Sequence, residues 1–288
     1  YTSFSLKEGK VSKSKEIQTK RLANNHLLVE NDLYRIEIDP EKGGTITSLY
    51  SKKEKKEWID NQAGYAFNEL RGNFYEEGGF LSSSSTPANV SVEVDGALIT
   101  TVSIKGKIGR HPFTQYLTLK KGDPRIDCRL IISWQGNTRI GERKETSKMQ
   151  ESRKTYYDDR YKLHLLFPVL PGHKQVYKNA PFDVCESKLK NTFFNRWDSI
   201  KNNVILNWVD LYDKQNDQAF CLFTDHTTSY LHGEDYPLGL TVQYSGGGLW
   251  GRDYAIKEQT EINYSFLPHR GMWNEAHISF ENARRGEP

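Results

Sequence analysis

Apolar and polar residues alternate with a period of two along much of the chain, a pattern typical of half-buried β-strands. The clearest case is the segment 126–134, in which every second residue from Ile126 to Trp134 is apolar. Because successive side chains of a strand point to opposite faces, one face of this segment is predicted to lie in a core. No segment keeps the spacing of an amphipathic helix. The pattern therefore predicts an all-β fold.

Turn residues between the alternating segments predict hairpins. Residues 34–39 alternate, and residues 45–50 are predicted to run back as the second arm of a hairpin. Pro40–Gly44 lies between them, where proline presets φ and glycine permits positive φ. Asp95-Gly96 is an equally strong two-residue turn signal. The other expected strands are 90–94, 98–104, 113–119, 126–134, 161–167, 204–211, 219–223, 238–244 and 262–267. So many strands without intervening helices predict a large antiparallel β-sandwich.

Two polar segments interrupt this pattern. Residues 1–29 are mostly polar and rich in lysine, and the chain does not start with Met. We expect them to be a linker or an edge segment leading in from a missing upstream domain, with the β-sandwich domain spanning 30–288. Residues 136–159 carry mixed charges and few apolar side chains, so they are expected to form a long polar loop.

Composition narrows the possible partners. The 288 residues include 40 basic and 37 acidic side chains, for a net charge of +3. This balance gives no indication of binding to nucleic acid or to an anionic membrane surface, which requires clustered positive charge. No apolar run approaches the ~20 residues of a membrane-spanning helix. The three cysteines form no CxxC pair, so neither a disulfide framework nor a zinc cluster is expected.

Motifs for catalysis or metal binding are missing from the sequence. The eight histidines are scattered, and no HxH, HxD or HExxH spacing occurs. His226 and His232 lie near three acidic residues, and we interpret that segment as a polar turn. A phosphate-binding glycine loop and a GxSxG nucleophile elbow are also absent. Glycoside hydrolysis needs two carboxyl groups, but 37 acidic residues offer too many candidate pairs for a choice.

One loop combines side chains suited to sugars. It runs from Tyr244 to Tyr254 and joins a glycine run to Trp250, Arg252 and Asp253. Tyr and Trp rings can stack on sugar faces, while Arg and Asp can hydrogen-bond hydroxyl groups in fixed geometry. The alternative interpretation is a wide hairpin loop whose aromatic side chains cover the end of the sandwich.

Several segments, taken in order, resemble a known family. The opening hairpin 30–50, with Gly43-Gly44 in its turn, and the closing segment 266–273, with its Pro-His-x-Gly-x-Trp pattern, resemble the C-terminal region of family 38 glycoside hydrolases, the α-mannosidases. Residues 194–197 and 207–211 are similar to a strand region between them, and 237–242 precedes the glycine loop. The resemblance covers the chain from about residue 30 to its end.

The resemblance implies a galactose-mutarotase-like supersandwich within a retaining, zinc-dependent α-mannosidase. In that family the nucleophilic Asp and the zinc ligands belong to earlier domains, so it implies no catalytic residue and no metal ligand in this chain, with the zinc in a missing catalytic domain. The implied partners are a mannose-containing glycan and the upstream catalytic domain of the same polypeptide. The resemblance makes the loop the substrate-facing part, with Tyr244, Trp250, Arg252 and Asp253 as its candidates.

Two alternatives remain open at this stage. One is an independent carbohydrate-binding module that uses exposed Trp or Tyr platforms. The other is an aldose-epimerase-like enzyme, which would need two histidines and a carboxylate on one concave face, with His111, His164 and His173 as the candidates. The segment 67–75 stands where the family often has Asp-Ala-Trp, so no sugar contact is transferred to it. His269 in the closing motif is predicted to be a buried, hydrogen-bonded histidine at a turn.

Overall fold

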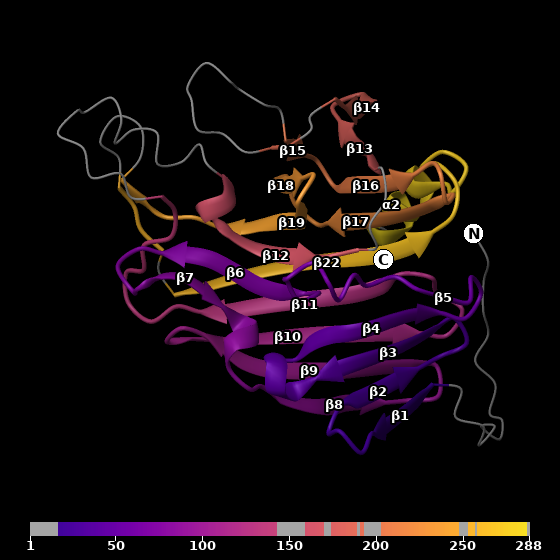
Figure 1. Ribbon diagram of the computed structural model, residues 1–288, viewed down its shortest axis with the longest axis horizontal. Helices are drawn as coiled ribbons and strands as arrows, with labels where there is room; N and C mark the ends of the chain where they lie inside the picture. Colours follow the sequence, from indigo (N-terminus) through magenta and orange to yellow (C-terminus); the bar gives the residue numbers. More distant parts are fainter. Residues whose placement is uncertain are drawn as a thin grey trace.

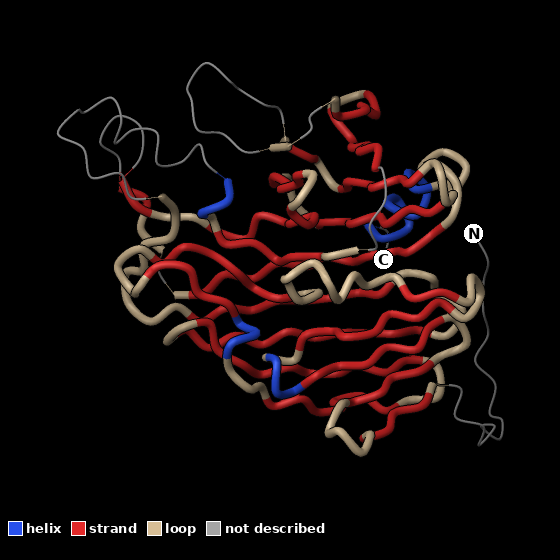
Figure 2. The backbone as a smooth tube through the Cα atoms, in the orientation of Figure 1, coloured by secondary structure: helices blue, strands red, loops and turns tan. Residues whose placement is uncertain are grey.

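The computed structural model describes residues 17–142, 159–169, 174–188, 191–192, 203–247, 253–256 and 258–286. Within these ranges the molecule is a sandwich of two β layers (Figure 1). Figure 2 shows that strands make up most of it and that the helical turns are short. The predicted all-β antiparallel sandwich is confirmed, because every strand pairing is antiparallel.

The back layer is a single nine-stranded sheet. Its strands are β8 (Asn89–Asp95), β9 (Ile99–Ile108), β10 (His111–Lys120), β11 (Ile126–Ser133), β13 (Lys174–Ala180), β14 (Asp183–Ser187), β16 (Trp208–Asp213), β17 (Gln218–Thr224) and β22 (Gln259–His269). They lie in the order β14-β13-β16-β17-β22-β11-β10-β9-β8. The C-terminal helix α2 (Ile278–Gly286) packs on the outer face of this layer through Ile278.

The front layer consists of two sheets side by side. The five-stranded sheet holds β1 (Gln18–Arg21), β2 (Leu27–Glu30), β3 (Tyr34–Asp39), β4 (Thr45–Ser51) and β5 (Lys56–Glu57) in sequence order. The six-stranded sheet holds β6 (Glu69–Phe74), β7 (Gly79–Ser82), β12 (Leu163–Phe167), β15 (Val204–Ile205), β18 (Thr228–Gly233) and β19 (Tyr236–Gln243). Its order is β15-β18-β19-β12-β6-β7. Short 3₁₀ helices η1 (Pro40–Lys42), η2 (Ser83–Ser85) and η4 (Asp159–Tyr161) lie beside these strands.

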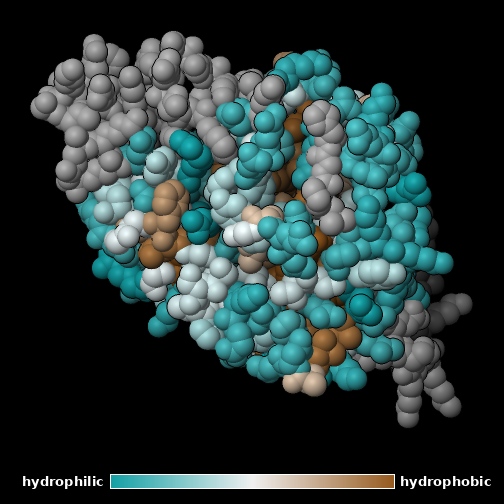
Figure 3. Space-filling model, viewed as in Figure 1, coloured by the Kyte–Doolittle hydropathy of each residue, from teal (hydrophilic) through white to brown (hydrophobic). Residues whose placement is uncertain are grey.

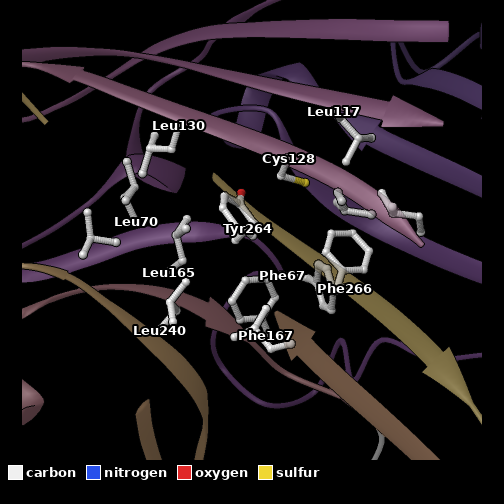
Figure 4. Close-up of a cluster of buried hydrophobic side chains, with 14 of the residues drawn as sticks. Phe67, Leu70, Leu117, Cys128, Leu130, Leu165, Phe167, Leu240, Tyr264 and Phe266 are labelled. Carbon is white, nitrogen blue, oxygen red and sulfur yellow. The ribbon is translucent and has the colours of Figure 1, made fainter. Parts of the chain in front are cut away.

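The main core fills the space between the layers. Phe67 lies at its centre, edge-on to the rings of Phe167 and Phe266, with centroid distances of 5.3 Å to each (Figure 4). The predicted face of β11 is confirmed, since Ile126, Leu130 and Ile132 are fully buried. Burial of each such side chain stabilises the fold by about 1.5–3 kcal/mol.

The predicted turn between β3 and β4 depends on its glycines. Gly43 and Gly44 have φ of +65° and +74°, in the left-handed region that favours glycine. A Cβ on Gly43 would collide with the carbonyl oxygen of Ser83, so η1 and η2 can lie against each other only with glycine there.

The expected single strand over 204–211 is wrong. The chain instead forms β15 in the front layer and β16 in the back layer, so this segment crosses between the sheets. The backbone N–H groups of Asn207 and Trp208 both donate to Oδ1 of Asn179, each at 3.0 Å. This side chain from β13 takes the place of ladder hydrogen bonds at the crossing.

Three other differences concern the chain ends and the polar segments. The segment expected to be a linker or edge contributes β1 and β2, with β1 at the sheet edge, while the domain division at residue 30 stays a prediction. Helix α2 was not predicted. Its only fully buried apolar side chain is Ile278, and so short a segment has too few apolar positions to show a helical period. Of the expected loop 136–159, residues 143–158 lie outside the described ranges.

Candidate functional site

The candidate loop leaves the end of β19 and returns through a small two-stranded sheet. Gly246 in β20 (Gly246–Gly247) pairs with Tyr254 in β21 (Asp253–Tyr254). Of the predicted sugar-facing residues, Trp250 and Arg252 lie outside the described residues, and only the backbone of Asp253 is described. Tyr244 is described, and 39% of its surface is exposed.

The base of the loop is fixed by buried hydrogen bonds. Ser245 is buried, and its hydroxyl donates to the carbonyl oxygen of Thr138 at 2.6 Å and accepts from the N–H of Ile140 at 2.9 Å. The N–H of Ser245 in turn donates to the carbonyl of Ile140 at 2.9 Å. Gly246 has φ of +126°, and a Cβ there would collide with the hydroxyl of Tyr75. The loop therefore starts from a rigid support.

A buried polar network supports the segment 136–142 from below. Nε2 of His111 lies 3.1 Å from both carboxylate oxygens of Glu77, and the Thr138 hydroxyl lies 3.2 Å from Oε1 of Glu77. The N–H of Gln135 donates to Nδ1 of His111 at 3.0 Å, which places the ring proton of the neutral imidazole on Nε2, toward Glu77. Sequence reasoning missed Glu77, because nothing in the sequence connects it to a histidine 34 positions later.

Tyr244 stands beside a fixed cation. Nζ of Lys162 lies 4.9 Å from the centroid of its ring and 2.5 Å from Oδ1 of Asp159. Asp159 is buried, and its other oxygen accepts from the amide of Asn203 at 2.6 Å. The ammonium is thus held over one ring face, while part of Tyr244 stays open to solvent.

The candidate histidines of the epimerase alternative do not converge. His111 lies between the layers and stacks on Phe74, at 5.6 Å between ring centroids. His164 pairs with Arg71 on β6, so strand alternation places its side chain on the outer face of the front layer. Burial lowers the pKa of His164 to about 3, and its Nε2 has no hydrogen-bond partner among the described residues. His173 lies outside the described residues.

His269 has the predicted structural role. Its Nε2 lies 3.1 Å from Oδ1 of Asp210, and the side chains are 8% and 0% exposed. Burial alone would lower the pKa of His269, but the Asp210 carboxylate outweighs burial and raises it. The pair joins the end of β22 to β16 on the outer face of the back layer.

Other polar groups add no further site. Within the described ranges, no three His, Cys, Asp or Glu side chains are grouped so that they could hold a metal ion. Nδ1 of His226 lies 2.7 Å from Asp225, which also accepts from Asn263 at 2.8 Å, as expected of a polar turn. The three cysteines are all described and are thiols. None of the described helices is long and apolar enough to cross a membrane.

Comparison with known proteins gives relatives of the same fold. An α-mannosidase from Enterococcus faecalis V583 superimposes with a TM-score of 0.63 and 13% identity, over 93% of this chain and 31% of that chain. A family 38 glycosyl hydrolase protein from Enterococcus faecalis gives 0.67 and 12%, over 97% and 34%. A proposed aldose 1-epimerase from Klebsiella pneumoniae gives 0.50 and 11%, over 93% and 87%. These superpositions show that the chain shares its β-sandwich fold with all three proteins, in line with the predicted large antiparallel β-sandwich.

The length of these relatives and a match to a family model identify the family of the chain. It spans about a third of the length of the two Enterococcus proteins. A search of curated protein sequences finds no match. The model described as "Glycosyl hydrolases family 38 C-terminal domain" matches residues 29–241, which is most of the chain. The chain therefore belongs to glycosyl hydrolase family 38, as a C-terminal domain of that family.

Proposed function

We propose that this chain is the non-catalytic C-terminal β-sandwich of a retaining, zinc-dependent α-mannosidase, and that its loops shape the sugar pocket. The observation that carries the proposal is the family match over residues 29–241 in a chain about a third as long as its solved relatives. In this proposal the nucleophile and the zinc belong to the upstream part of the same polypeptide, and the partner is a mannose-containing glycan.

The loop from Tyr244 to Tyr254 is the proposed contribution of this chain to the pocket. Its support favours such a role, because Ser245 is buried and bonded on both sides while Tyr244 beside it stays partly exposed. A rigid base can hold a binding loop in one geometry with little loss of entropy when substrate arrives. Arg252, Asp253 and Trp250 are proposed to contact sugar, with Arg252 the strongest candidate since a guanidinium forms directional hydrogen bonds.

Hydrolysis of an aryl α-mannoside tests the division of labour. The full-length polypeptide is expected to release mannose with retained configuration, to lose activity with a chelator and to regain it with zinc. The isolated 288-residue chain is expected to be inactive. Hydrolysis by the isolated chain would overturn the non-catalytic assignment, and failure of the full-length protein on α-mannosides would overturn the mannosidase assignment.

The role of the loop is tested in the full-length protein. Arg252→Ala is expected to lower kcat/KM for the α-mannoside by about tenfold or more, equal to about 1.4 kcal/mol of lost binding in the transition state. Arg129→Gln, on the outer face of the back layer, is the matched control and should leave kcat/KM unchanged. Equal activity of both variants would remove Arg252 from the pocket.

A further inference from the structure

Arginine and aromatic side chains alternate across the outer face of the six-stranded sheet. Cζ of Arg71 lies 5.6 Å from the ring centroid of Tyr65 and 5.3 Å from that of Phe80, so the guanidinium lies between two rings. Tyr65 also packs on Tyr236 at 4.9 Å, and Phe80 on Tyr161 at 5.3 Å. These five side chains come from β6, β7, η4, β19 and the turn before β6. We call them the aromatic ladder.

The ladder keeps binding groups available to solvent. Phe80 is 44% exposed, and the other four members are half-buried. Arg71 has no carboxylate or other hydrogen-bond acceptor within the described part of the chain, although a guanidinium carries five N–H donors. A guanidinium held between two rings loses little further freedom when it binds a ligand. Its donors are therefore in place for a partner from outside.

The two ends of the aromatic ladder lie next to a polar cleft and next to the candidate sugar loop. Tyr236 lines an open cleft of about 1330 Å³, which Asp60, Lys174, His232 and Glu234 also line. At the other end Tyr161 is followed by Lys162, whose ammonium lies over Tyr244 at the start of the candidate sugar loop. The ladder therefore spans the front layer between a polar cleft and that loop.

We propose that the aromatic ladder binds an extended glycan, several linked pyranose units long, and leads it to the loop at Tyr244. Pyranose rings have one face of C–H groups that stacks on aromatic rings and a rim of hydroxyl groups that accept hydrogen bonds, which fits Phe80 and Arg71 respectively. A single sugar would cover one ring, whereas a chain can contact several in succession. The ladder thus adds affinity for long substrates.

A glycan fits this face better than another protein does. Stable protein interfaces have an apolar core, but the visible part of the front face in Figure 3 is mostly hydrophilic, with its hydrophobic areas set among hydrophilic ones. Tyrosine and arginine flanked by polar side chains are suited to hydroxylated ligands. The choice of mannose as the sugar rests on the proposed function, while the ladder itself requires only a glycan chain.

Calorimetric titration of the 288-residue chain tests the ladder. Mannopentaose is expected to bind at least about tenfold more tightly than free mannose. Phe80→Ala and Arg71→Gln are each expected to weaken mannopentaose binding by about tenfold, or about 1.4 kcal/mol. Phe80→Tyr keeps a stacking ring and should bind as the unchanged chain does. Thermal unfolding of each variant checks that it is folded.

Matched controls lie on the outer face of the back layer. Phe280, which is 66% exposed on α2, is replaced by Ala, and Arg129, which is paired with Glu261, is replaced by Gln. Both should bind mannopentaose within about twofold of the unchanged chain. If the ladder variants bind like these controls, or if no oligosaccharide binds, the proposal is wrong.

Two further experiments test the aromatic ladder independently of the proposed function and test whether its face is a contact with another domain. Ladder-dependent binding of cellopentaose, without binding of mannopentaose, would support the ladder and count against a mannosidase. If a Phe80→Cys thiol reacts with maleimide in the isolated chain but is shielded in the full-length protein without glycan, the face is a domain contact and the ladder proposal is overturned. Unchanged reactivity in both supports an open glycan surface.

Discussion

Arg71 on the front face and Arg129 on the back face both lie over aromatic rings, 5.3 Å from the centroid of Phe80 and 6.0 Å from that of Tyr116. Their remaining contacts differ. Nε of Arg129 donates to the carboxylate of Glu261 at 2.8 Å. Arg71 has a second ring, that of Tyr65, in place of a carboxylate. The same residue type is therefore satisfied internally on one face and available on the other.

Two other cross-strand pairs near Arg129 on the back face are also bonded to each other. Cross-strand pairs meet there, with 3.0 Å between the hydroxyls of Thr101 and Thr118 and 2.7 Å between Nζ of Lys120 and Asp127. Such pairs give small stabilising terms of about 0.2–1 kcal/mol each. A face whose groups bond to one another offers little to a ligand, and this difference is what points to the front face as the binding surface.

Both faces rest on one shared core, and removing its central ring should have the largest effect. Phe67→Ala is expected to lower the free energy of unfolding by about 3–5 kcal/mol, because Phe167, Phe220 and Phe266 all lose an edge-on partner and a cavity remains. Urea denaturation at neutral pH measures it. Phe280→Ala, with the same loss of a ring at an exposed site, should change it by less than about 0.5 kcal/mol. Similar effects of the two variants would contradict the central position of Phe67.

The two buried histidines extend the comparison to pH. His164 on the front face has its pKa lowered to about 3 by burial, so below about pH 6.5 the unfolded chain binds a proton that the folded chain does not. Stability is therefore lost as the pH falls. Since each pKa unit corresponds to about 1.4 kcal/mol, His164 should cost about 2–3 kcal/mol between pH 7 and pH 4.5. His164→Gln should show a correspondingly smaller loss in urea denaturation at the two pH values.

His269 on the back face should make stability depend on pH in the opposite direction. Its pKa is raised by Asp210, so its stabilisation is present below the unfolded pKa of about 6.5 and is lost as the pH rises through the folded value. His269→Gln should therefore destabilise the protein more at pH 6 than at pH 8.5. If both histidine variants shift stability in the same direction with pH, the contrast between the two faces fails.

The sequence predicted those parts of the fold that local patterns determine. The strand 126–134 and the turn at Gly43-Gly44 could be read because alternation and backbone preference act over a few residues. The crossing between β15 and β16 could not be predicted. Asn179, whose side chain replaces the hydrogen bonds between strands there, lies 28 positions from Asn207. Contacts of this kind exist only after the sheets have assembled.

The same limit separates the loop from the ladder. The loop is one continuous segment, so its glycine run and its aromatic residues were visible together. The ladder joins Tyr65, Arg71, Phe80, Tyr161 and Tyr236, whose side chains meet only because β6, β7, η4 and β19 come together. The glycine needed at Gly246 was likewise not predictable, because Tyr75 approaches it from another strand end.

A smaller effect on stability is expected at the base of the candidate loop, next to the front face. Ser245→Ala leaves the N–H of Ile140 and the carbonyl of Thr138 without their side-chain partner, at a cost of about 1–2 kcal/mol in the free energy of unfolding. Hydrogen exchange at Ile140 should become faster. Ser245→Thr keeps the hydroxyl and serves as the control. Unchanged exchange in Ser245→Ala would mean that the loop does not depend on this support.

The smallest effect is expected on the back face itself. Lys120→Gln removes an ion pair whose side chains are 38% and 28% exposed, so solvent and salt already screen it. The expected loss is about 0.2–1 kcal/mol at low salt and should nearly vanish at 1 M salt. Urea denaturation at the two salt concentrations measures both values. A large loss that persists in high salt would mean that back-face pairs do more than satisfy one another, and the contrast with the available guanidinium of Arg71 would then be weaker.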